Sequence, residues 1–100
     1  MNSDQGFDWL DAEVFSAIAW GATDDTGVIG FVDWIQHMIM TDAELKSSLE
    51  NLVQAGWIER NDNKLELSKK AKLAVKDAQG KNVQHTRKAC ARALGVERIS

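Results

Sequence analysis

Residues 52–71, LVQAGWIERNDNKLELSKKA, change their residue pattern several times, and this constrains the fold more than any other part of the chain. Apolar residues at helical spacing stop at Gly56, where a left-handed residue would end a helix. Alternating apolar and polar residues then flank 61–63, Asn-Asp-Asn, whose side chains favour tight turns. We therefore predict a β-hairpin with strands at 57–60 and 64–67.

A strong helix-start signal precedes the hairpin. Residues 41–44, Thr-Asp-Ala-Glu, match a capping box, and Met40 and Leu45 stand at the spacing of a hydrophobic staple. A helix is thus predicted to begin at Thr41, one or two residues after the end of a helix over 30–39. So short a joint requires a sharp bend, which predicts a helix-turn-helix. The residues expected to face the core from this helix are Leu45, Leu49, Leu52 and Val53.

Apolar spacing predicts further helices on both sides of this unit. An isolated two-stranded hairpin is marginal in water, so the hairpin must pack on these helices. The predicted fold class is mainly α with one β-hairpin. The remaining expected elements are a helix over 8–22 with Leu10, Val14 and Ile18 on one face, a very short strand at 28–29, a helix begun by Ser68 and ended by Gly80, and a helix over 82–94 ended by Gly95.

Composition narrows the possible settings of the chain. Its 100 residues are 44% hydrophobic and 27% charged, which suits a globular domain with one modest core. No apolar run is long enough to cross a bilayer, so no membrane contact is expected. The acidic amino terminus does not resemble a secretory signal, and the lone Cys90 allows no intrachain disulfide. These features favour a cytoplasmic location.

The net charge of −3 conceals a marked asymmetry along the chain. Residues 1–66 hold thirteen Asp and Glu and three Lys and Arg, whereas residues 67–100 hold two and nine. The pattern fits three alternatives: two solvated faces, a basic arm for an anionic partner, or two surfaces that meet across an isologous dimer interface. The basic residues concerned are Lys69, Lys70, Lys72, Lys76, Lys81, Arg87, Lys88, Arg92 and Arg98.

The stretches ELKSSLENLVQAGWIER and KLELSKKAKLA resemble the winged helix-turn-helix superfamily, in particular small bacterial regulators of the MarR, PadR and ArsR kind. The resemblance covers about residues 8–78. It implies a winged domain over 1–80 and a basic helical extension over 81–100, which often builds the dimer in such regulators. The positions that carry the likeness are Leu49, Leu52, Gly56, Trp57, Ile58, Leu67 and Ser68.

This resemblance implies a DNA-binding transcriptional regulator that acts as a homodimer on duplex DNA. Lys46, Ser47 and Asn51 would face bases or phosphates from the recognition helix, and Arg60 and Lys64 would hold the backbone from the wing. The recognition helix also carries carboxylates, which phosphates repel, and the wing has few basic residues. Both features oppose DNA binding. The alternative is a winged-helix protein-interaction module with little affinity for DNA.

Other candidate sites are sparse. Trp34 is the expected interface anchor, with Cys90 and Leu94 of the last helix; the four tryptophans are otherwise expected to fill the core or its edge. Cys90 alternatively packs as a small apolar residue. The spacing of His37, His85 and Cys90 fits no zinc site, and no catalytic or cofactor-binding motif occurs. We therefore expect no metal, no cofactor and no enzyme activity.

Overall fold

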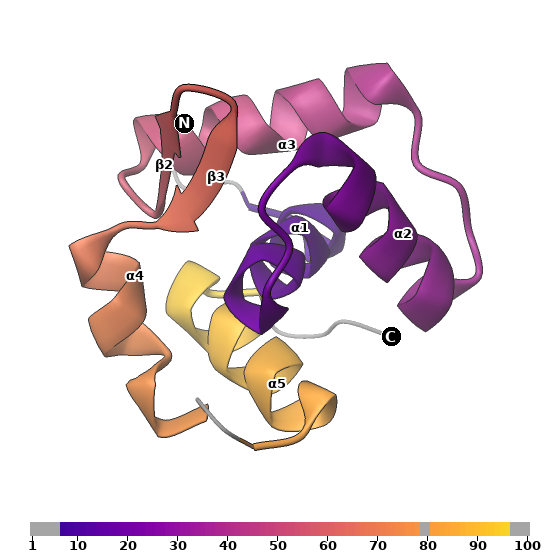
Figure 1. Cartoon of the computed structure of the whole chain (residues 1–100). Coiled ribbons are helices and arrows are strands. Elements are labelled where there is room, and N and C mark those ends of the chain that lie inside the picture. Colours follow the sequence, from indigo (N-terminus) through magenta and orange to yellow (C-terminus); the bar gives the residue numbers. More distant parts are fainter. Residues whose placement is uncertain (1–6, 79–80, 97–100) are drawn as a thin grey trace.

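The computed structural model describes residues 7–78 and 81–96 of the chain. Over these residues the protein is mainly helical with one antiparallel two-stranded hairpin, as the sequence predicts. Figure 1 shows the elements in chain order. They are α1 (Trp9–Trp20), α2 (Asp25–Gln36), α3 (Asp42–Gln54), β2 (Ile58–Asn61), β3 (Lys64–Leu67), α4 (Lys69–Ala74), the 3₁₀ turn η1 (Lys76–Ala78) and α5 (Val83–Leu94).

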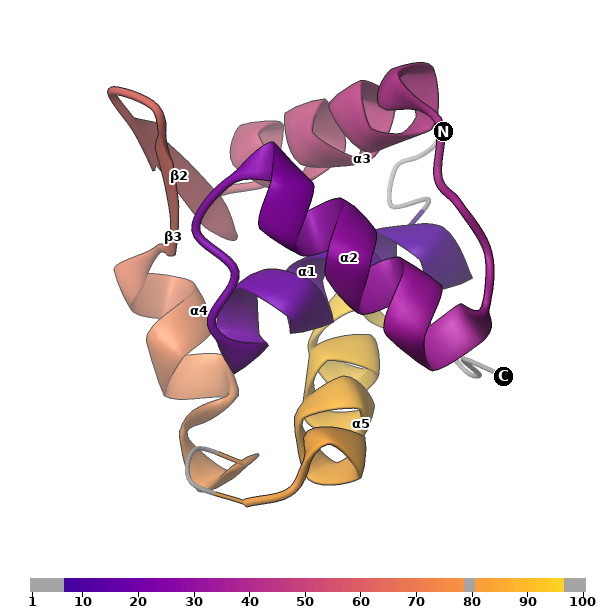
Figure 2. The ribbon, with the colours of Figure 1, turned by 45° about the vertical axis from the view of Figure 1, so that its right-hand side comes forward.

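Helix α1 is the central element, with α2, α3 and α5 packed around it (Figures 1 and 2). Every residue from 11 to 18 is buried, so the expectation of one apolar face was too narrow. The polar members of this stretch need partners because burial removes their water. Ser16 donates to the Ala12 carbonyl at 2.7 Å, and Glu13, fully buried, accepts from Arg87 of α5 and Gln36 of α2.

Helix α2 differs from its predicted bounds of 30–39. It begins five residues earlier because the Asp24 side chain accepts from the Gly27 amide and caps it. The strand predicted at 28–29 is therefore wrong, since both residues are helical. The helix ends at His37 in the left-handed conformation, so residues 37–40, rather than one or two residues, precede the cap of α3.

Helix α3 begins and ends as predicted. Thr41 and Glu44 form both hydrogen bonds of the capping box, at 3.1 and 2.9 Å. At the other end Gly56 adopts φ +82°, and the amides of Gly56 and Trp57 donate to the carbonyls of Val53 and Leu52. This is the Schellman arrangement, and it turns the chain directly into the hairpin.

The hairpin has the predicted strands to within one residue. Its register pairs Ile58 with Leu67 and Asn61 with Lys64, so a two-residue turn at 62–63 joins the strands. Asp62 takes φ +56°, which Asp tolerates in such turns. The Leu65 amide donates to the Thr23 carbonyl at 2.8 Å, which ties the hairpin to the segment between α1 and α2.

The carboxy-terminal helices complete the same core. Ser68 caps α4 as predicted, but α4 ends at Ala74 and η1 follows; the predicted stop at Gly80 lies outside the described residues. Helix α5 packs along α1, and Cys90 and Leu94 belong to the core cluster. Residues 81–96, the described part of the predicted extension over 81–100, thus share the core of residues 7–78.

The tryptophans lie farther out than predicted. Trp9, Trp20 and Trp34 are 38%, 44% and 56% exposed, and only Trp57 is half-buried, with its ring 5.5 Å from that of Phe15. Mostly small and aliphatic residues from six elements, α2, α3, β2, β3, α4 and α5, fill the space around α1 instead. Most of the tryptophans therefore contribute exposed apolar surface and do not fill the core.

Candidate binding surfaces

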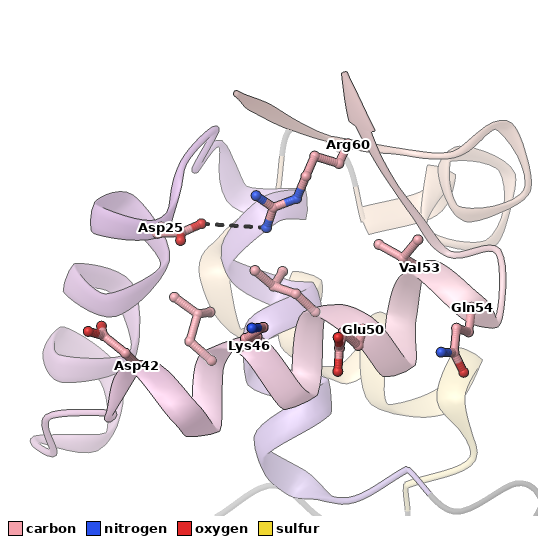
Figure 3. A pocket seen from close by; sticks show the side chains of 9 residues that line it. Asp25, Asp42, Lys46, Glu50, Val53, Gln54 and Arg60 are labelled. Atoms are coloured by element: carbon pink, nitrogen blue, oxygen red, sulfur yellow. Dashed lines mark ion pairs between the residues drawn. The ribbon is translucent and has the colours of Figure 1, made fainter. Parts of the chain in front are cut away.

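A groove of about 510 Å³ runs along α3 between the hairpin and the start of α2. Leu45, Leu49 and Val53 supply its apolar lining, and Val53 is 40% exposed. The predicted core position of Val53 is wrong, because this residue faces the groove. The polar lining residues are Asp25, Asp42, Lys46, Glu50, Gln54 and Arg60 (Figure 3).

Two of the five predicted DNA-contact residues line this groove. Arg60 reaches from β2 toward the start of α2, where its guanidinium lies 3.8 Å from the Asp25 carboxylate (Figure 3). Lys46 projects from α3 on the same side and is exposed. The pairing of Arg60 with a carboxylate offsets part of the positive charge that a phosphate would require.

Two others lie elsewhere on α3. Asn51 lies on the side of α3 toward α1, where its side chain and that of Ser48 act on the Asp11 carboxylate. Burial raises the pKa of Asp11 above its usual 3.8, and the polar side chains of Ser48 and Asn51 oppose part of that rise. Ser47 is exposed but does not line the groove. The predicted set is thus divided between two sides of the helix.

The hairpin carries a carboxylate pair, which opposes its predicted contact with DNA. Glu59 and Glu66 are directly opposite each other in the register, and the Asn61 amide donates to Glu66 at 2.9 Å. Like charges at such positions repel each other and any nearby phosphate. Lys64, the fifth predicted contact, is exposed on β3 at the turn.

Helix α3, the hairpin and the first turn of α2 together form what we call the acidic end of the molecule. Its basic side chains are Lys46, Arg60 and Lys64. Against them stand seven carboxylates: Asp25, Asp42, Glu44, Glu50, Glu59, Asp62 and Glu66. The surface predicted to bind DNA is therefore negative overall.

The candidate interface residues have unequal positions. Trp34 is exposed, and its ring packs edge-on against Phe31 with 5.9 Å between centroids. Cys90 is fully buried and Leu94 is 9% exposed, so both side chains are used within the chain and offer little surface to a second copy. Burial also raises the pKa of the Cys90 thiol to about 12, which keeps it protonated and unreactive.

The groove itself was not foreseen from the sequence. Its lining joins Asp25 to Arg60 and both to α3, and no local pattern brings these segments together. The sequence did weakly indicate that Val53 is exposed. Val53 follows Leu52, and only one of two adjacent residues can lie at the centre of a helix face.

Residues 7–78 and 81–96 contain no group of three or more His, Cys, Asp and Glu side chains placed to hold a metal ion. Nor does any helix in this part of the chain combine the length and apolar character needed to cross a membrane. Comparison of the sequence with family models and curated proteins, and of the structure with solved structures, found no match.

Proposed function

We propose that this chain is a winged helix-turn-helix module that binds a segment of another protein in the groove along α3. The observation that carries the proposal is the groove itself, with an apolar lining and a rim that is net negative. Such a lining suits an apolar side chain, whereas a phosphate backbone offers nothing apolar to fill it.

The order and capping of the elements support the winged arrangement. Helices α2 and α3 are followed through Gly56 by a tight hairpin, and Thr23 provides a single backbone hydrogen bond at the place of a third strand. In this arrangement β2 and β3 form the wing beside α3, which gives the groove its second wall.

The charges of the groove define the chemistry of its occupant. Asp42 and Glu50 lie along α3 without an ion-pair partner among the described residues, whereas Asp25 forms an ion pair with Arg60. An amphipathic segment with one or two apolar anchors flanked by Lys or Arg would fill the apolar lining and neutralise these carboxylates.

Selection from a random-peptide library tests this proposal. We expect the recovered peptides to combine Lys or Arg with Leu, Ile or Phe, and to lose binding to Val53→Asp, which places a charge in the groove. The matched control is Leu73→Asp, since Leu73 is 66% exposed on α4 and outside the groove. Peptides that bind both variants as tightly as the unchanged protein would contradict the proposal.

The second candidate is the DNA-binding regulator that the resemblance implies. Lys46 and Lys64 favour it, because both are exposed on α3 and the wing, with no carboxylate of the described residues within ion-pair distance. The seven carboxylates around them oppose it. A homodimer with Trp34 at its interface remains a prediction, which light scattering at several concentrations would test.

A further inference from the structure

Helices α4 and α5 form a second charged surface, which we call the basic end. Helix α5 and the end of α4 lie away from α3 in both views of the ribbon (Figures 1 and 2), whereas the start of α4 adjoins the hairpin. Both α4 and η1 pack against α5. Seven exposed cationic side chains project from this region: Lys69, Lys70, Lys72, Lys76, Lys81, Lys88 and Arg92. Asp77 is the one carboxylate within 68–78 and 81–96.

These cations are largely uncompensated. None of the seven lies within ion-pair distance of a carboxylate in the described residues, in contrast to Arg60 at the acidic end. Only Lys70 has an internal role, since its ammonium donates to the Ala55 carbonyl at 2.7 Å and lies 4.2 Å from the centre of the Trp57 ring. The other six remain available to an external anion.

Their spacing gathers the charges on helix faces. Lys69 and Lys72 are three residues apart on α4, and Lys88 and Arg92 are four apart on α5, so each pair shares one side of its helix. We propose that this basic end binds the phosphate backbone of duplex nucleic acid without reading its sequence.

The residue types identify this partner. Six of the seven cations are lysines, which act as point charges and lack the planar fork with which arginine reads guanine. The large exposed apolar residue here is Leu73 alone, too little for the apolar centre of a protein interface or for insertion into a bilayer. Neither helix carries Phe, Trp or Tyr, the residues on which single-stranded bases stack.

The acidic end makes the binding directional. Its seven carboxylates repel phosphates from α3 and the hairpin, so a duplex approaches α4 and α5. This inference does not depend on the groove proposal, because none of the seven cations lines the groove. It also differs from the second candidate function, which places DNA on α3.

Two charge-reversal variants test the inference. The basic-end variant is Lys72→Glu with Lys88→Glu, and the matched control is Lys46→Glu with Lys64→Glu at the acidic end. All four side chains are exposed, and each pair lowers the formal net charge of −3 by the same four units. A difference between the variants therefore reports where the duplex binds and not how much charge changed. Thermal unfolding of both confirms that they remain folded.

Fluorescence anisotropy with a labelled random-sequence duplex, over a series of salt concentrations, supplies the readout. We expect the unchanged protein to bind at low salt, and the basic-end variant to bind about tenfold or more weakly, with a salt slope smaller by about 2. The control should stay close to the unchanged protein.

Three results would overturn the inference. They are no binding of the unchanged protein at low salt, an equal or greater loss in the control, and sedimentation evidence that the basic end is occupied by the acidic end of a second copy at low salt. The second of these results would support DNA binding through α3 instead.

Discussion

The acidic and basic ends of this protein differ in how far their charged side chains are paired within the molecule. At the acidic end, Arg60 pairs with Asp25, Asn61 bonds to Glu66, and apolar residues open into a groove. At the basic end, six cations have no internal partner and little apolar surface accompanies them. The first surface is suited to a protein segment whose apolar side chains fit the groove. The second is suited to a polyanion with regularly spaced phosphates. The fold class alone would not separate these roles.

Among the described residues, one buried ion pair joins the acidic and basic parts of the sequence, between Glu13 and Arg87. Arg87, from the basic third of the sequence, donates to both carboxylate oxygens of Glu13, with 3.0 Å from Nε to Oε1. Gln36 donates to the same carboxylate, and Gln84 accepts from Arg87 at 3.1 Å. Helices α1, α2 and α5 are thereby held together beneath the surfaces that differ.

The largest expected effect comes from breaking this pair. Arg87→Met leaves the Glu13 carboxylate buried without its cation, and we expect the free energy of unfolding to fall by about 3–5 kcal/mol. Urea denaturation measures the change. Lys88→Met is the control, because Lys88 is the exposed neighbour and should shift stability by less than about 0.5 kcal/mol. Equal midpoints for the two variants would contradict the assignment.

A smaller effect is expected at the junction of α3 and the hairpin. Gly56→Ala forces a side chain into φ +82° and should cost about 1–2 kcal/mol. Gly30→Ala is the matched control, since an added Cβ there meets nothing within 4 Å in the middle of α2. That change should stabilise the protein by about 0.5–1 kcal/mol. Thermal unfolding of both variants should therefore give shifts of opposite sign.

The carboxyl group of Asp11 is expected to make the stability of the protein depend on pH. Its pKa is raised in the folded protein from 3.8, so the folded state holds this proton more tightly than the unfolded chain. The stabilising contribution is present below about pH 3.8 and is lost as pH rises through the folded-state pKa. Relative to the unchanged protein, Asp11→Asn should therefore gain stability as pH increases from 3.8. A constant difference between the two would contradict this.

The smallest effect concerns the exposed pair of the groove. The side chains of Asp25 and Arg60 are 59% and 47% exposed, so solvent screens their attraction. Asp25→Asn should change stability by less than about 1 kcal/mol in urea denaturation. It also frees Arg60, so any duplex affinity at the acidic end should rise; a drop would contradict the sign assigned to this surface.

Sequence reasoning succeeded where the determinants are local. The capping box at Thr41, the left-handed Gly56 and the turn at Asp62 depend on residues within a few positions, and the structure has all three. The predicted start of α2 is wrong because Gly21 and Gly27 suggested a loop between them, whereas the Asp24 cap begins the helix inside that segment.

The other failures involve long-range contacts. The burial of α1 on all sides depends on three helices that pack around it, and the Glu13–Arg87 pair joins residues 74 positions apart. The division of Lys46 and Asn51 between two sides of α3 follows from where α1 and β2 lie against that helix. None of these relations leaves a periodic signal in the chain.

The central claim is that phosphates contact the basic end and not α3 with the hairpin. Amide chemical-shift mapping by NMR, during titration with a short random duplex at low salt, tests it most directly. We expect the perturbed amides to lie within residues 69–78 and 81–96. Perturbation confined to residues 42–67 would contradict it.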